Sequence, residues 1–151
     1  MNKLELLKPE ARRAVELFVA SLEKHGYRYT IIETLRTQET QDAYYAQGRL
    51  PLEEVNLLRR KAGLYAIGED AAKRIITKVK YSVHQDGRAA DIAPVANGKI
   101  PWDINSETAP LWLAFGKLGI EAGLGWGGLW EPFDRFGIGW DAPHYEMKEA
   151  V

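Results

Sequence analysis

Two short segments, far apart in the chain, combine histidines with carboxylates. Residues 82–91 have the sequence SVHQDGRAAD and residues 141–144 have the sequence DAPH. A catalytic zinc ion usually takes three His, Asp or Glu ligands and keeps a fourth position for water, whose pKa falls to about 7. The two segments hold two of the three histidines of the protein, so their residue types and spacing predict a metal site of His84, Asp91 and His144.

A further carboxylate precedes the second histidine. Asp141 lies three residues before His144, so it can reach a water on the metal without binding the metal itself. This position suits a general base, which takes a proton from the water and returns it to a leaving amine. Glu146 competes for this role, because on a strand it shares a face with His144, or it orients a histidine instead. We rank Asp141 first.

The elements around the first segment suit a turn followed by a buried strand. Gly87 allows the chain to turn sharply. Alternation over residues 88–95 places Ala89, Asp91 and Ala93 on one face of this strand. These small neighbours leave space beside Asp91 for a metal and a substrate. A second short strand is expected around residues 144–147, so the third ligand comes from a distant segment.

Apolar spacing predicts most of the remaining elements. Helices are expected over residues 9–25, 37–47, 51–61 and 108–122, and a strand over residues 27–35. Residues 69–76 fit either a short helix or the start of a strand. Arg36 lies at the junction of strand and helix, where side chains often face a site, although local sequence alone favours a surface arginine.

Length and composition narrow the class of protein. The 151 residues suit a single catalytic domain over residues 1–151, without a separate wall-binding domain. A net charge of −1 gives no support for nucleic-acid binding, and the lack of cysteine excludes disulfides and thiolate catalysis. No apolar leader or membrane span is evident. We therefore expect a protein that is made in the cytoplasm and does not insert into a membrane, and we also expect a monomer.

A family resemblance runs through these motifs in order. Residues 82–91 match S-x-H-x-x-G-x-A-x-D, the signature of the zinc D-Ala-D-Ala peptidase family and its peptidoglycan-cleaving relatives. Residues 126–130 and 141–146 resemble its W-G-G-x-W and D-x-P-H-[FWY]-E motifs. Upstream, residues 35–41 and 45–49 resemble its G-Y-R-[ST]-x-x-E-Q and Y-x-x-G-R segments. Within this family the sequence is most similar to the L-alanyl-D-glutamate endopeptidases of phages and prophages.

The resemblance implies an α+β fold in which helices flank a small antiparallel sheet. It also implies one catalytic zinc ion on His84, Asp91 and His144, with Asp141 as general base. Arg36 would bind the scissile carbonyl and stabilise the oxyanion that forms on it, a role that suits a guanidinium. Residues with a weaker claim to substrate contact or to support of the ligands are Ser82, Glu146, Trp126, Trp130 and Tyr145.

The sequence departs from the family pattern in three places. Residues 33–35 read ETL instead of a small residue, Gly and Tyr before Arg36, and Thr40 stands where the family often has Glu. Neither change removes a catalytic group, although the first alters the packing beneath Arg36. The helical stretch 51–74 is longer than in many relatives and could shape a substrate groove.

The function implied by the resemblance is hydrolysis of the L-Ala–D-Glu bond of peptidoglycan stem peptides. The protein would be a phage-type endolysin that reaches the cell wall after holin-type release, with a thin Gram-negative wall as its target. One alternative is a D-Ala-D-Ala carboxypeptidase acting on peptidoglycan precursors. Another is a non-catalytic, zinc-stabilised binding module, against which the presence of both Asp141 and Arg36 argues.

Overall fold

The computed structural model of the chain describes residues 4–77, 80 and 83–147. Contacts divide it into two compact units, one formed by Met1–Leu35 and Asp86–Val151 and the other by Arg36–Gln85. We call the first the sheet unit and the second the helical unit. The helical unit is therefore an insertion within the sequence of the sheet unit, and a single catalytic domain over residues 1–151 stays a prediction.

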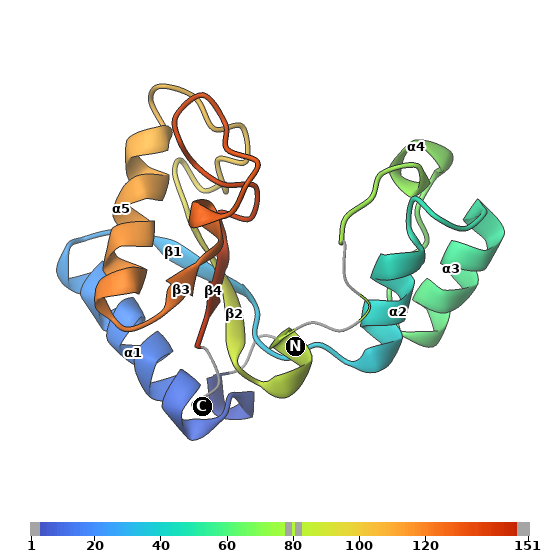
Figure 1. Cartoon of the computed structure of the whole chain (residues 1–151), viewed down its shortest axis with the longest axis horizontal. Helices are drawn as coiled ribbons and strands as arrows, with labels where there is room; N and C mark the ends of the chain where they lie inside the picture. The colour runs from blue at the N-terminus through green and yellow to red at the C-terminus, as the bar shows by residue number, and fades with distance from the viewer. Residues whose placement is uncertain (1–3, 78–79, 81–82, 148–151) are drawn as a thin grey trace. The chain divides into compact units, whose positions relative to one another are not determined.

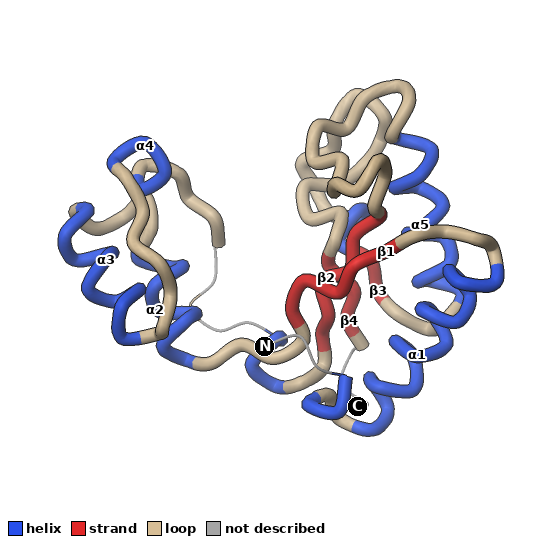
Figure 2. Tube along the Cα trace, turned by 180° about the vertical axis from the view of Figure 1, so that it is seen from behind, coloured by secondary structure: helices blue, strands red, loops and turns tan. Residues whose placement is uncertain are grey.

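An antiparallel sheet forms the centre of the sheet unit (Figures 1 and 2). Its described strands, in order across the sheet, are β1 (Tyr29–Glu33), β2 (Ala89–Pro94), β4 (His144–Glu146) and β3 (Gly125–Trp126). Three of them correspond to predicted strands, whereas β3 is only two residues long and was not predicted. The α+β fold with a small antiparallel sheet is confirmed.

Two helices cover one face of this sheet, α1 (Pro9–Lys24) and α5 (Ala109–Glu121) (Figure 1). Pro9 suits the first turn of α1, and Gly26 follows its C-terminus with a φ of 76°. Both helices match the predicted ranges closely. They enclose a core dominated by large aromatic side chains, which include Phe18, Trp112, Phe115, Trp126 and Tyr145.

The helical unit contains α2 (Gln38–Ala46), α3 (Leu52–Lys61) and α4 (Glu69–Ala72). Thr37 caps α2 as predicted, because its Oγ1 accepts a hydrogen bond from the Thr40 backbone N–H at 3.2 Å. Residues 69–76 thus begin with one short helix rather than a strand. The apolar residues that the structure describes as buried in this unit are small, namely Ala43, Ala46, Val55 and Ala72.

Three short 3-10 turns complete the described elements, η1 (Leu4–Leu6), η2 (Val83–Asp86) and η3 (Gly127–Leu129). η2 lies two residues before β2 and η3 directly follows β3, and both strands carry predicted site residues. Among the helices that the structure describes, none combines the length and apolar character needed to cross a membrane.

Candidate metal centre

The pairing of the two central strands brings Asp91 and His144 together. They are direct partners across the antiparallel β2–β4 ladder. Residues opposite each other in such a ladder project from the same face with Cβ atoms about 4.5–5.5 Å apart. The His144 Nδ1 atom accordingly lies 3.5 Å from the Asp91 Oδ1 atom. The register of the sheet therefore builds two thirds of the predicted ligand set.

The third ligand comes from the turn that leads into β2. His84 lies in η2 and is buried, and Gly87 follows with a φ of 68°. The Gly87 carbonyl accepts a hydrogen bond from the Lys8 backbone N–H at 2.9 Å, which secures this turn. His84, Asp91 and His144 each offer one ligand atom, and these atoms all lie within 4.8 Å of one another.

The donor set fits a zinc ion. Two imidazoles and one carboxylate are a known combination for catalytic zinc, with bonds of about 2.0–2.2 Å. Tetrahedral angles at such bond lengths separate neighbouring ligand atoms by about 3.3–3.6 Å. The 3.5 Å between His144 Nδ1 and Asp91 Oδ1 agrees with this separation. The arrangement can therefore close around one ion with small side-chain adjustments.

Two further carboxylates lie on opposite sides of the His144 ring. The Asp141 Oδ2 atom is 3.9 Å from Nδ1, on the side that also faces Asp91. The Glu146 Oε1 atom is 3.1 Å from Nε2, within hydrogen-bond distance. A histidine that binds a metal through one nitrogen usually donates its other N–H to a carboxylate or carbonyl. The geometry therefore favours Glu146 as the residue that orients His144. Asp141 lies on the other side of the ring, where Nδ1 would bind the ion.

The surroundings of His144 concentrate negative charge at a buried position. Burial lowers the pKa of His144, but hydrogen bonds to Asp91 and Glu146 and the charges of Asp141 and Asp91 outweigh burial and raise this pKa to about 9. Such a site stabilises a positive charge, either a proton on the imidazole or a metal cation beside it.

The W-G-G-x-W segment supports the loop that carries Asp141. Trp126 is buried, and its Nε1–H donates to the Ala142 carbonyl at 2.6 Å. A Cβ atom on Gly127 would overlap the backbone carbonyl of Asp141, so only glycine permits this close approach. Trp126 therefore holds the 141–144 segment. Sequence reasoning did not identify Gly127, although the fixed spacing of the motif was a visible signal.

Of the other predicted site residues, Trp130 lies beside the candidate metal centre, whereas Tyr145 lies in the core. The Trp130 ring lies beside the ring of His144, with 4.9 Å between centroids. Tyr145 is fully buried in the core, where its ring centroid is 4.5 Å from that of Phe18. This placement gives Tyr145 a packing role. Ser82 lies outside the described residues.

Arg36 is half-buried and held by several contacts within the helical unit. Its backbone N–H donates to the His84 carbonyl at 3.2 Å, and its Nη1 donates to Gln41 Oε1 at 2.8 Å. The guanidinium also lies 4.9 Å from the ring centroid of Tyr44. These contacts restrict the rotamers of Arg36, and its role toward a scissile carbonyl stays a prediction.

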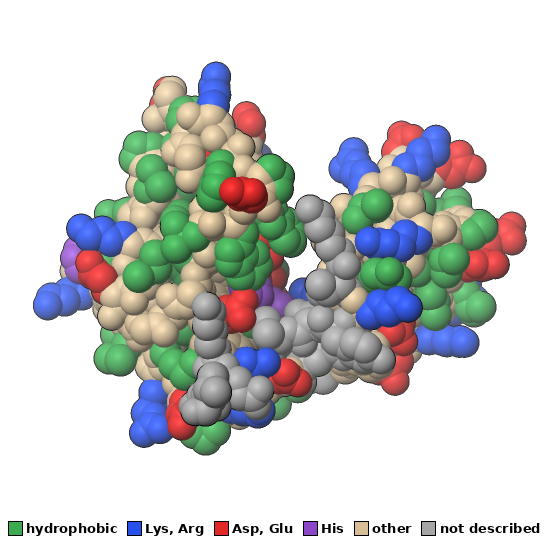
Figure 3. Space-filling view, viewed as in Figure 1, with side chains coloured by type: hydrophobic (Ala, Val, Ile, Leu, Met, Phe, Trp, Pro, Cys, Tyr) green, Lys and Arg blue, Asp and Glu red, His purple; other side chains and the backbone are tan. Residues whose placement is uncertain are grey.

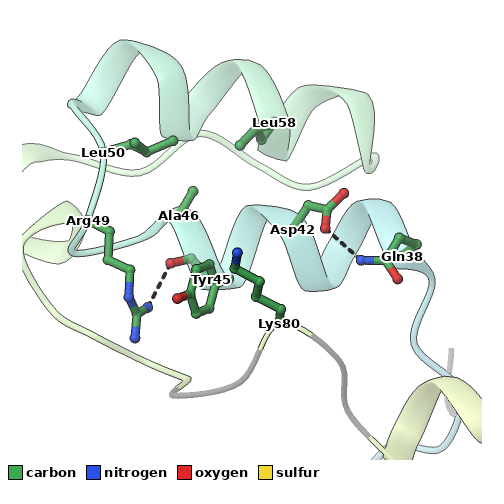
Figure 4. A pocket seen from close by; sticks show the side chains of 8 residues that line it. All are labelled: Gln38, Asp42, Tyr45, Ala46, Arg49, Leu50, Leu58 and Lys80. Atoms are coloured by element: carbon green, nitrogen blue, oxygen red, sulfur yellow. Dashed lines mark hydrogen bonds between the residues drawn. The ribbon is translucent and has the colours of Figure 1, made fainter.

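A cavity of about 330 Å³ lies within the helical unit, between α2 and α3 (Figure 4). Its cations, Arg49 and Lys80, both lie over the Tyr45 ring, at 4.0 and 5.6 Å from the centroid. Its carboxylate, Asp42, accepts a hydrogen bond from Gln38 at 2.6 Å. The polar groups thus interact with one another, and the cavity makes a weaker candidate site than the metal centre.

Comparison with known proteins supports a peptidase. The model of a family described as D-alanyl-D-alanine carboxypeptidase matches residues 76–147, the segment that carries all three candidate ligands and Asp141. The resemblance to the zinc D-Ala-D-Ala peptidase family is therefore confirmed for this segment, whereas the similarity to the phage and prophage branch stays a prediction. Together with the His-Asp-His triad, the match supports a hydrolase of the metallopeptidase type. No curated protein matches the chain by sequence.

Solved structures share the fold at low sequence identity. One is the L-Ala D-Glu endopeptidase ChiX of Serratia marcescens, with a TM-score of 0.53 and 18% identity over 96% of this chain and 83% of that chain. Another is the LdcB LD-carboxypeptidase, with a TM-score of 0.53 and 17% identity over 93% of this chain and 58% of that chain. At such identity the likeness establishes the architecture alone.

Proposed function

We propose that the protein is a zinc peptidase that hydrolyses the L-Ala–D-Glu bond of peptidoglycan stem peptides. The observation that carries this proposal is the cluster of His84, Asp91 and His144, with the Asp141 carboxylate on the same side of the His144 ring. The family match supports peptidase chemistry, the name of ChiX specifies an L-Ala D-Glu endopeptidase, and the structure of LdcB is described as showing peptidoglycan recognition.

In this proposal His84, Asp91 and His144 hold the ion. Zinc bound there supplies a Lewis acid that polarises the scissile carbonyl and makes water a better nucleophile at neutral pH. Asp141 accepts the proton of the attacking water and delivers it to the amine that leaves. Glu146 keeps the proton on His144 Nε2, so Nδ1 would be the atom that binds the ion.

In this proposal Arg36 stabilises the oxyanion that forms on the scissile carbonyl. A guanidinium whose orientation is already restricted, here by Gln41 and Tyr44, loses little freedom when negative charge develops on the carbonyl oxygen. Substituting Arg36 by Lys keeps the charge but removes the planar pair of donors. We expect kcat to fall about 100-fold, the usual cost of losing one oxyanion donor.

The main alternative keeps the metal chemistry and changes the bond. The description of the matching family names D-alanyl-D-alanine carboxypeptidase, and that of LdcB names an LD-carboxypeptidase. Release of a terminal D-Ala requires recognition of a free carboxylate beside the scissile bond. In contrast, an endopeptidase must accept chain on both sides. The residues that decide between these activities lie outside the shared motifs.

The deciding experiment is digestion of purified peptidoglycan by the zinc-loaded protein, followed by mass spectrometry of the new termini. Free L-Ala carboxyl and D-Glu amino groups support the endopeptidase. Release of D-Ala alone supports the carboxypeptidase instead. Absence of cleavage by folded, zinc-loaded protein would contradict both and favour a zinc-stabilised binding module.

The biological setting forms a separate part of the proposal. A phage-type endolysin, released to the cell wall through a holin lesion and acting as a monomer, agrees with the branch that the motifs resemble. Expression in the cytoplasm with and without a co-expressed holin tests this setting. Lysis only in the presence of the holin is the expected result.

A further inference from the structure

Exposed aromatic and aliphatic side chains gather on the loop between β3 and β4. Trp140 is 46% exposed, Phe133 is 49% exposed and Leu129 is 58% exposed, while Trp130 is half-buried between Trp140 and His144. Figure 3 shows hydrophobic and acidic side chains together on this part of the sheet unit, next to a histidine. An apolar surface beside a candidate active site is a common mark of a binding surface.

Backbone contacts hold the two tryptophans side by side. The Trp140 N–H donates to the Trp130 carbonyl at 3.3 Å, and the two ring centroids are 6.1 Å apart with planes inclined by 43°. Asp134 Oδ1 accepts hydrogen bonds from the backbone N–H groups of Phe136 and Ile138, which closes the tip of the loop. The aromatic surface is therefore organised before a ligand arrives, which lowers the entropic cost of binding.

This surface is continuous with the metal centre. The Trp130 ring bridges the two, since its centroid is 4.9 Å from that of His144 on one side and 6.1 Å from that of Trp140 on the other. A substrate group that lies on Trp140 is thus about two ring widths from the ligand atoms. Such a group must be chemically close to the bond that is cleaved.

The charged residues of the loop indicate which part of the substrate this surface can bind. Glu131 and Asp134 are exposed on the same loop, where the guanidinium of Arg135 lies over the Phe136 ring. A stem peptide carries several carboxylates, which these acidic groups would repel. An N-acetylhexosamine ring is neutral, has an apolar C–H face that stacks on indole, and has hydroxyls that donate to carboxylates.

We propose that Trp130 and Trp140 form a saccharide-binding surface that accepts the amino sugar of the glycan strand beside the metal centre. This inference rests on the proposed cleavage of the L-Ala–D-Glu bond, because that bond is separated from the sugar by only one amino acid and a lactyl group. A D-Ala terminus lies several residues farther from the sugar. A saccharide surface next to the metal therefore fits the endopeptidase better than the carboxypeptidase.

The kinetic test compares two substrates that differ only in the sugar, a disaccharide tetrapeptide and the same tetrapeptide without sugar. In Trp140→Ala we expect kcat/KM for the glycosylated substrate to fall about tenfold through KM, the loss expected for one aromatic contact, with the sugar-free peptide unaffected. Trp102→Ala is the matched control, because Trp102 is 58% exposed and packs on Trp112 elsewhere in the sheet unit. Equal losses on both substrates, or no loss on either, would overturn the proposal.

A binding test separates this inference from the proposed function. Titration of the zinc-loaded protein with tetra-N-acetylchitotetraose, followed by tryptophan fluorescence and by NMR of the indole N–H signals, requires no cleavage. We expect saturable binding that Trp140→Ala weakens about tenfold and Trp102→Ala leaves unchanged. If wild-type protein cleaves neither substrate but shows this pattern, the proposed bond is wrong and the saccharide surface stands. Binding that is absent, or unchanged by Trp140→Ala, contradicts the saccharide surface.

Discussion

The two units of the chain are stabilised in different ways. The sheet unit encloses a continuous core in which the Phe18 ring contacts Phe115 edge to face and Tyr145 at a tilt. Among its described residues, the helical unit has one fully buried branched apolar side chain, that of Val55, which is accompanied by buried alanines. Buried apolar area contributes about 25 cal/mol per Å², so the sheet unit gains much more from its core.

Polar contacts replace apolar area in the helical unit. Gln41 and Gln47 are both buried there, and the Gln47 Nε2 atom donates to the Ala71 carbonyl at 2.8 Å. Asn56 exchanges two hydrogen bonds with the Ile67 backbone at 2.9 and 3.0 Å. A hydrogen bond typically contributes only about 0.5–1.5 kcal/mol net, so this unit should open at a lower free energy. Asp91, His144 and Asp141 belong to the more rigid unit, as precise ligand geometry requires.

The largest expected effect is the loss of an aromatic ring from the sheet unit. Phe18→Ala removes a fully buried ring from the centre of the core, and we expect the free energy of unfolding to fall by about 3–5 kcal/mol. Urea denaturation followed by circular dichroism measures this change. Val55→Ala is the counterpart in the helical unit, with an expected loss of about 1–2 kcal/mol. A loss at Val55 equal to that at Phe18 would contradict the difference between the units.

The second-largest expected effect is a steric clash with the backbone of Asp141, the proposed general base. Gly127→Ala adds a methyl group where the Asp141 carbonyl already lies, and we expect a stability loss of about 1–3 kcal/mol together with a large fall in kcat. Gly68→Ala serves as control for the added methyl group, because the space around Gly68 is open and its φ of −87° is one that alanine adopts readily. Full activity in Gly127→Ala would show that the contact does not position Asp141.

Hydrogen exchange sharpens the comparison in the helical unit. Gln47→Ala removes the side-chain donor to the Ala71 carbonyl. We expect the free energy of the openings through which the amides of α2 and α4 exchange to fall by about 1–2 kcal/mol relative to the wild type. Amides of α1 and α5 should keep their protection. Equal loss of protection in both units would mean that they unfold as one cooperative body.

The smallest expected effect concerns a helix cap. Thr37→Ala deletes the hydroxyl that accepts the Thr40 N–H, which should cost about 1 kcal/mol of local stability in α2. Thr37→Ser keeps the acceptor and should restore most of the loss. Protection of the first amides of α2 provides the measurement, and unchanged protection in Thr37→Ala would exclude a capping role.

Local rules explain what could be predicted from the sequence. Periodicity and capping residues predicted α1, α2, α3 and α5 to within one or two residues, and the motif spacing selected His84, Asp91 and His144, which the structure brings together. The register of β2 against β4 could not be derived, because strand pairing between distant segments depends on the whole core. For the same reason the packing of Gly127 against Asp141 and the pairing of Trp130 with Trp140 became visible only in the fold.

Substituting Asp141 by Asn tests the central claim most directly, with zinc content and turnover measured on the same sample. Asp141 should act on the proton and not hold the ion, so Asp141→Asn should retain one zinc per chain while cleavage of peptidoglycan falls by at least about 100-fold. Asp103→Asn makes the same chemical change at an exposed position of the sheet unit and should keep both zinc and activity. Loss of zinc in Asp141→Asn, or full activity in that variant, would contradict the roles assigned to this site.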